Sequence, residues 1–237
     1  MSYQFENDNS HTQNSADGFI QFDWDPSAHW NMIGGLRYDY FSASSKSRLS
    51  AKIGVMYKLN GWRFRTSYAG GFRAPSLKEL FMHFNMANVF TIYGNKNLKP
   101  ENSDNFQISA EYTRRNYSFS ANAFHNIFRN RISTAWNTAL NGMNYLNTAK
   151  VRITGLDINA QTRFLCGIGL TASYVYTHEN IPMGQPYTSS TRPHSAVLRA
   201  DYDHNFRTWG FNVALTGRYL SKLSIDQYTS ATSYTQT

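Results

Sequence analysis

The side chains that most often carry out catalysis or bind metals are sparse in this sequence. It contains seven histidines and one cysteine, Cys166. No two histidines have the HExxH spacing that places metal ligands on one helix face, and one cysteine excludes an internal disulfide and a cysteine-based zinc site. His194, Ser195 and Asp201 are the residue types of a hydrolase triad, but no nucleophile elbow surrounds the serine. We therefore expect no enzyme, no metal site and no cofactor.

Composition narrows the class of protein further. The 237 residues include 23 Lys and Arg against 15 Asp and Glu, a net charge of +8, but the basic residues are scattered singly, so we expect no nucleic-acid partner. Charged residues make up only 16%, against about 25% in soluble domains, and aromatic residues reach 16%. Disordered chains contain few aromatic residues. With a mean hydropathy of −0.53, no apolar run approaches the ~18 residues of a membrane-spanning helix.

Apolar and polar residues alternate along almost the whole chain, with the period of two that is typical of β-strands. Between Trp30 and Tyr40 the even positions are apolar or small, whereas Asn31, Arg37 and Asp39 are polar. The same alternation recurs in about ten segments, each near the ~10-residue length of a membrane-spanning β-strand. Aromatic residues bracket several of them, as in the two headgroup belts of a membrane protein.

Short and long connections alternate between these segments. Tight turns are expected at residues 25–27, 60–61, 115–116, 166–167 and 205–207, and long loops at 42–48, 74–104, 133–144 and 179–193. Short turns at one end and long loops at the other are typical of an outer-membrane barrel. The prediction is an all-β fold: an antiparallel transmembrane β-barrel meander, a partial barrel of about ten strands with short periplasmic turns and long extracellular loops. A soluble β-sandwich is the alternative, but its strands usually have about 5–6 residues.

Two motifs flank the longest loop. Residues 71–81 read GFRAPSLKELF and residues 93–103 read YGNKNLKPENS. Pro75 and Pro100 lack an amide donor, so each should end ladder pairing, and Arg73 and Glu101 are placed to form a lumen-facing ion pair at the base of the loop. We expect a structural role for the motif residues, which are Phe72, Arg73, Ala74, Pro75, Asn95, Asn97, Leu98, Pro100 and Glu101.

These motifs closely resemble two adjoining boxes of TonB-dependent outer-membrane receptors. Lys96 is a departure, because the family commonly has proline there. The resemblance implies the outer membrane of a Gram-negative bacterium, contact with its lipid, and TonB-energised uptake of a ferric siderophore or cobalamin, with haem as an alternative ligand. A passive porin and a surface adhesion barrel are alternatives of a different class.

The resemblance also implies a larger assembly than this chain. The family's barrel has about 22 strands around an N-terminal plug domain that contacts the TonB complex. The polar start of the chain, Met1-Ser2-Tyr3, has no export signal. We therefore expect residues 1–237 to be part of one receptor barrel domain, without the plug and the remaining strands.

The long loops contain the residues that we expect to touch a ligand. Large rings cover much ligand area at little conformational cost, and a basic group pairs well with an anionic chelate. Some haem-importing members of the family have a haem-binding histidine between the two boxes, where His83 lies in this sequence. The candidate ligand-binding residues are Lys78, Phe81, His83, Phe84, Phe90, Tyr93, Trp136, Tyr187 and Arg192.

Overall fold

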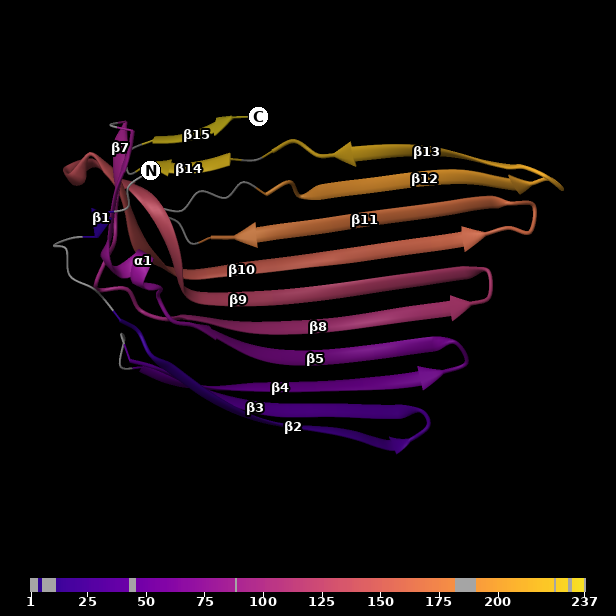
Figure 1. Ribbon diagram of the computed structural model, residues 1–237, viewed down its shortest axis with the longest axis horizontal. Coiled ribbons are helices and arrows are strands. Elements are labelled where there is room, and N and C mark those ends of the chain that lie inside the picture. Colours follow the sequence, from indigo (N-terminus) through magenta and orange to yellow (C-terminus); the bar gives the residue numbers. More distant parts are fainter. Residues whose placement is uncertain are drawn as a thin grey trace.

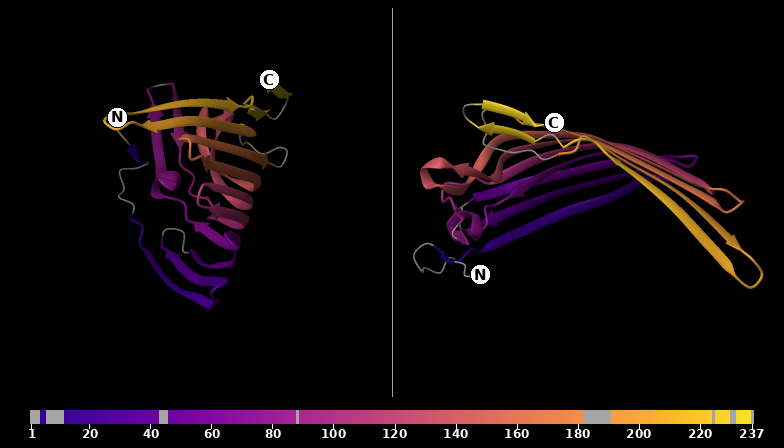
Figure 2. Two further views of the ribbon diagram at one scale, coloured as in Figure 1. Left: turned by 90° about the vertical axis from the view of Figure 1, so that its right-hand side faces the viewer. Right: turned by 90° about the horizontal axis from the view of Figure 1, so that it is seen from above.

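Ten long antiparallel strands form the wall of the protein. The computed structural model describes residues 4–5, 12–42, 46–87, 89–181, 191–223, 225–229 and 232–236. Within these ranges the chain forms one curved 13-stranded sheet and a separate hairpin (Figures 1 and 2). The wall strands are β2 (Ser15–Ser27), β3 (Trp30–Phe41), β4 (Lys46–Leu59), β5 (Trp62–Arg73), β8 (Glu101–Arg114), β9 (Tyr117–Asn137), β10 (Gly142–Arg163), β11 (Ile168–Asn180), β12 (His194–Asn205) and β13 (Gly210–Leu220).

The shorter elements lie at the end of the sheet that carries the long connections. They are β1 (Gln4–Phe5), α1 (Leu77–Phe81), β6 (Met82–Met86), β7 (Phe90–Tyr93), a 3₁₀ turn (Thr138–Leu140), and the separate hairpin of β14 (Ile225–Thr229) and β15 (Thr232–Gln236). Figure 1 shows all the tight turns at the opposite end. None of the helices in the described part of the chain has the length and apolar character that a bilayer crossing demands. The predicted meander and its strand number are confirmed.

The cross-strand register separates two chemically different faces. Ile108 pairs with Ala123, Ala123 with Leu156, and Leu156 with Tyr176, so one rung of four strands presents apolar groups on one face. The next rung, on the opposite face, contains Ser109, Asn122, Asp157 and Val175. Because side chains alternate along a strand, we call these the lipid-facing and the lumen-facing sides of the wall.

Polar groups on the lumen-facing side bond to one another across the strands. Arg63 and Arg65 both bind Glu111, at 3.0 and 2.9 Å, and the Asn122 amide accepts a bond from Gln107 at 2.7 Å. On the lipid-facing side, by contrast, Leu198 is 65% exposed. A soluble protein would bury such a surface, whereas lipid covers it in a barrel.

Aromatic rings gather at the tight-turn end of the lipid-facing side, as the sequence predicts. Trp62 lies 4.8 Å from Tyr112, and Trp30 lies 4.7 Å from Tyr57. Six residues further along the same two strands, Tyr68 lies 5.1 Å from Phe106. Rings at two levels fit the two headgroup regions of a membrane.

Two local predictions are wrong. The turn expected at residues 25–27 lies instead at Ala28 and His29, because β2 continues past Pro26 with a one-residue register shift between Trp24 and Ser27. A bulge in an edge strand tolerates a proline, which has no amide to donate. The loop expected at 133–144 is mostly strand: β9 runs to Asn137, and β10 begins at Gly142 after a left-handed Asn141 with φ 45°.

The sheet is open at both sides. Among the described residues, β2 pairs with β3 alone and β13 with β12 alone, so both are edge strands. An unpaired strand edge leaves backbone groups without partners in lipid. The predicted half-barrel with two free edges is confirmed.

The two faces of the wall should tolerate charge differently. In a barrel closed by further strands, Leu198→Arg places a cation in lipid near mid-strand, so we expect a loss of about 2–4 kcal/mol in the free energy of unfolding. The control, Val175→Arg, lies on the lumen-facing side directly opposite Asp157, and should cost under about 1 kcal/mol. Denaturant unfolding in lipid vesicles measures both, and equal losses would contradict the assignment of the faces.

Candidate functional site

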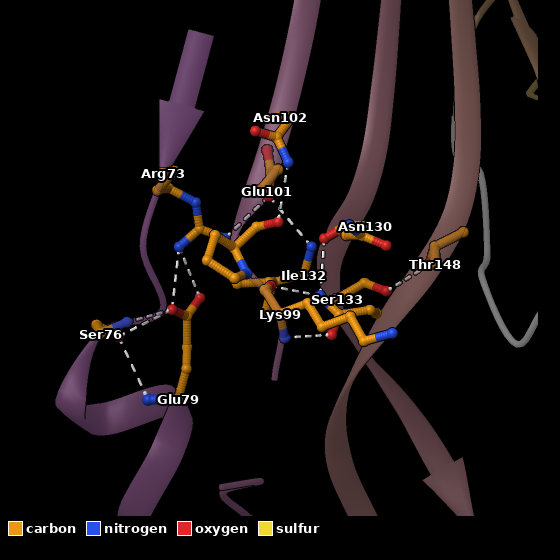
Figure 3. A network of polar contacts seen from close by, with 12 residues as sticks. Arg73, Ser76, Glu79, Lys99, Glu101, Asn102, Asn130, Ile132, Ser133 and Thr148 are labelled. Atoms are coloured by element: carbon orange, nitrogen blue, oxygen red, sulfur yellow. Dashed lines mark hydrogen bonds and ion pairs between the residues drawn. The ribbon is translucent and has the colours of Figure 1, made fainter. Parts of the chain in front are cut away.

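The longest connection, residues 74–100, is attached to the wall by an arginine with two acidic partners. Arg73 ends β5 and pairs in register with Glu101 at the start of β8. Its guanidinium binds Glu101 at 3.0 Å and Glu79 at 2.9 Å (Figure 3). Both residues of the pair lie on the lumen-facing side, in line with Arg63, Arg65 and Glu111. The predicted ion pair is therefore confirmed, and Glu79 is an additional member.

Glu79 also fixes the start of α1. The Ser76 hydroxyl accepts a bond from the Glu79 amide at 3.3 Å, and the Glu79 carboxylate accepts one from the Ser76 amide at 2.8 Å. This is a capping box, which satisfies amides that a helix start leaves unpaired. The Ser-x-x-Glu pattern can be read in the sequence, but neither Ser76 nor Glu79 was among the predicted site residues. One carboxylate thus joins the helix start to the end of β5.

The second motif attaches the connection to the β9–β10 hairpin. The Glu101 carboxylate accepts a bond from the Ile132 amide at 3.1 Å, and the Asn147 amide group exchanges two bonds with the Lys99 backbone at 2.7 and 2.9 Å. Asn95 donates to the Tyr145 carbonyl at 3.0 Å. Asn147 lies outside both motifs, and the sequence analysis did not predict it as a partner of the second motif.

A small apolar core lies among these polar contacts, and we call the Arg73 ion pairs, the bonds of the second motif and this core together the anchor. Leu80, Leu98 and Ile132 are buried together, with Phe81 and Tyr145 packed against them. Burial, and to a smaller degree the Glu79 carboxylate, raises the pKa of the Tyr145 phenol, so it stays neutral. Lys96, which departs from the family pattern, places its ammonium 5.7 Å from the centre of the Phe81 ring. Phe81 is therefore a packing residue of the anchor.

The other motif residues surround the same anchor. Pro75 is fully buried. The Phe72 ring lies 5.6 Å from that of Phe41, and the Asn97 amide donates to the Asn95 side chain at 2.9 Å. Ala74 and Pro100 lie in the irregular segments that enter and leave the connection. All of these contacts are made within the protein, and the structural role of the motifs stays a prediction.

Beyond the anchor, β6 pairs with β7, β7 pairs with the projecting part of β10, and β10 pairs with β9, while β1 pairs with the outer edge of β6. We call β6, β7 and the projecting parts of β10 and β9 the four-stranded sheet. β7 runs parallel to β10, with Ile92 opposite Met143, and Met143 is opposite Trp136 of β9. Phe84 of β6 is opposite Ile92. One rung therefore contains Phe84, Ile92, Met143 and Trp136, and we call it the apolar row. Its end is accessible, because Trp136 is 54% exposed.

The candidate aromatic residues divide between the two faces of this small sheet. The Phe90 ring lies 6.0 Å from Trp136, edge to face, and Phe90 is two residues from Ile92, so it shares the face of the apolar row. His83 pairs with Tyr93 in register, and their rings lie 5.0 Å apart. By strand alternation this pair occupies the opposite face. His83 therefore shares its face with Tyr93 and not with Phe84, Phe90 or Trp136.

The remaining candidates lie elsewhere. Lys78 is exposed on α1. Arg192 donates to the Ser221 carbonyl at 2.7 Å, beside β12 and β13, and β11 separates it from the four-stranded sheet. Tyr187 lies outside the described residues. Within the described ranges, no three His, Cys, Asp or Glu side chains are grouped to hold a metal ion.

Removing the arginine should loosen the connection without unfolding the wall. Arg73→Gln leaves two neighbouring carboxylates without their cation, so we expect local opening of α1 and β6 to become easier by about 2 kcal/mol, or roughly 30-fold in amide exchange rate. Arg63→Gln is the control, because Arg65 still neutralises Glu111. Hydrogen exchange measures both variants. Unchanged protection of α1 in Arg73→Gln would show that the anchor does not hold the connection.

Comparisons with known proteins agree with this architecture. The family model described as TonB dependent receptor-like, beta-barrel matches residues 2–237. The "Iron-regulated outer membrane virulence protein" of Vibrio cholerae is 28% identical over 181 residues, which are 70% of this chain and 28% of that protein. The "Probable hemoglobin and hemoglobin-haptoglobin-binding protein 4" of Haemophilus influenzae is 25% identical over 179 residues, 67% of this chain and 18% of that protein.

A solved structure has the same fold. The siderophore receptor PirA from Acinetobacter baumannii superposes with a TM-score of 0.69 at 19% identity, over 89% of this chain and 35% of that one. This chain thus spans about a third or less of the relatives that it matches. The family model covers nearly all of it, and such barrels are outer-membrane receptors of Gram-negative bacteria and not enzymes. The chain belongs to the TonB-dependent receptor family, as part of its outer-membrane β-barrel.

Proposed function

We propose that this chain supplies part of the barrel wall and a ligand-contacting surface to a receptor that imports an iron chelate, in the first place a ferric siderophore, with energy from TonB. The observation that carries this proposal is the anchored four-stranded sheet. It presents Phe84, Phe90 and Trp136 on one face at the end of the barrel with the long connections. Rigid aromatic rings on a fixed support bind a ligand at a low entropic cost.

The position of this surface suits capture at the cell exterior. In outer-membrane barrels the longer connections are extracellular, and β7, which contains Ile92 of the apolar row, lies among them (Figure 1). Arg73 connects α1, which leads into β6 of the row, to the lumen-facing ends of β5 and β8. A ligand held on the row would lie near the entrance to the polar lumen. This arrangement favours a receptor over a passive porin or an adhesion barrel, neither of which requires such a surface.

The partners follow from the family. A TonB-energised receptor requires a plug domain in the lumen and the TonB complex, and its substrate is a small molecule rather than a nucleic acid. Iron is the better supported cargo, because similar proteins include one named as iron-regulated and one named as a siderophore receptor. Cobalamin has no such support among these relatives.

The apolar row can be tested in the receptor that carries this sequence. Phe84→Ala and Trp136→Ala should each weaken binding of a ferric siderophore about tenfold, because each removes a large contact area. Binding of a radiolabelled iron chelate to outer-membrane vesicles measures this change. Leu140→Ala is the control, since Leu140 is exposed in the tip of the same hairpin but outside the row. Unchanged affinity at normal surface expression would remove the row from the binding site.

Haem is the second candidate ligand, and the His83–Tyr93 pair is the observation that favours it. His83 is exposed on β6, and its ring lies 5.0 Å from that of Tyr93. One relative is named as a probable haemoglobin-binding protein. An exposed imidazole is a common iron ligand, and a neighbouring phenol adds a flat surface and a hydroxyl.

The two ligands predict different responses to one substitution. If the receptor binds haem, His83→Ala should weaken haem binding about tenfold, or about 1.4 kcal/mol, and Asn85→Ala on the same face of β6 should not. The haem absorption spectrum measures the binding. A receptor that takes up a siderophore and shows no change in haem binding on His83→Ala would exclude this candidate and leave the siderophore proposal standing.

A further inference from the structure

Three basic side chains lie on the lipid-facing side of β9 and β10, toward the end with the long connections. Arg129 is directly opposite Lys150, and Arg152 follows Lys150 by two residues. The register of β9 and β10 is continuous from this pair to Thr162 opposite Tyr117. Strand alternation therefore places all three on the same side as Ala123 and Leu156. We call Arg129, Lys150 and Arg152 the basic cluster.

Most of the charge of the basic cluster is not neutralised by the protein. Asp104 of β8 binds Arg129, and its other carboxylate oxygen accepts a bond from the Tyr68 hydroxyl at 2.9 Å. In the part of the chain that the structure describes, Lys150 and Arg152 have no acidic partner. Like charges directly opposite each other destabilise a sheet, and a surface that contacts lipid is a costly place for them. An anion from outside the chain would remove both penalties.

An apolar groove of about 550 Å³ adjoins the basic cluster on the same face. It crosses β4, β5, β8, β9 and β10 where short side chains, Thr66, Ala123 and Thr154, lie between larger ones such as Ile53 and Phe106. One contact and one neighbouring position connect it to the cluster. Tyr68 lines the groove and binds Asp104, and Thr154, two residues from Arg152, lines its other end. A charged site and an apolar groove thus form one continuous surface.

We propose that this surface binds one phosphorylated lipid of the outer leaflet, with the head-group phosphate on Arg129, Lys150 and Arg152 and an acyl chain in the groove. The charge is complementary, since Lys and Arg side chains are attracted to the phosphates of an anionic membrane surface. The position along the strands also fits. The cluster lies between the apolar rungs and the long connections, near Tyr68, where lipid head groups contact a barrel. The site is distinct from the ligand-binding surface, which lies beyond the wall on the four-stranded sheet.

A second groove on the wall provides an internal comparison. It has about 690 Å³ and lies toward the tight turns, lined by Phe119, Ala160, Leu170, Ala172 and Leu198 among others. The one charged residue in its lining is Arg199, which alternation places on the lumen-facing side, where it lies 3.7 Å from Asp201. It is comparable in size and apolar character but has no cationic end on the lipid-facing side. It should therefore exchange its lipid freely.

The test uses the receptor purified from outer membranes in mild detergent, with retained phosphorylated lipid quantified by native mass spectrometry. The double substitution Lys150→Gln and Arg152→Gln should reduce retained lipid about tenfold or more. The matched control, Lys52→Gln with Arg218→Gln, removes two basic groups that alternation places on the lumen-facing side, and should retain lipid as the wild type does. Equal retention in the first variant, or equal loss in the control, overturns the proposal.

A second pair of variants tests the groove independently of charge. Ala123→Leu fills the groove beside the basic cluster and should reduce retained lipid, whereas Ala172→Leu fills the second groove and should not. Added inorganic phosphate separates the two sources of the anion. Displacement of the lipid by millimolar phosphate would show that the site recognises the phosphate group only. Wild-type retention in Ala123→Leu would show that the groove holds no acyl chain. Either result overturns the lipid proposal. Retained heat-modifiable mobility on gels confirms that each variant is folded.

Discussion

The pairing of backbone amides and carbonyls across neighbouring strands is the constraint on which the rest of this structure depends. A chain that crosses a bilayer with strands has no water to satisfy these groups, so each strand must lie between two others. Eight of the ten wall strands follow this rule, and β9 and β10 are paired over as many as twenty residues. The rule also explains why β2 and β13, each with one partner among the described residues, are surfaces for further strands.

The same pairing separates two kinds of chemistry by a single residue step. On the lumen-facing side, Arg63, Arg65 and Glu111 neutralise one another, and amides bond across strands. On the lipid-facing side, the middle of the wall is mostly apolar, and the charged residues Asp104, Arg129, Lys150 and Arg152 lie toward the long connections. A charge is tolerated there because the head-group region is polar. The position of a residue along its strand thus decides whether lipid, water or another side chain is its partner.

At the end of the wall, the backbone ladder of β5 ends at Arg73, and side-chain ion pairs hold the chain beyond it. Arg73 is still in register with Glu101, yet its guanidinium also reaches Glu79 and so the start of α1. The small core of Leu80, Leu98 and Ile132 packs around this point. The connection is therefore not a loose loop but a folded attachment that holds β6 and β7 against the projecting hairpin.

The sequence by itself determined the wall, the two motifs and the ion pair between Arg73 and Glu101, because alternation and proline chemistry act between near neighbours. Tertiary structure alone decided the rest. Residues 133–137 were predicted to be part of a loop. They form a strand because β10 offers them a partner, and β7 in turn pairs with β10. His83 and Phe84 are adjacent in sequence and lie on opposite faces, and Asn147 meets Lys99 from 48 residues away. Such contacts depend on which strands meet, and local sequence patterns do not encode that choice.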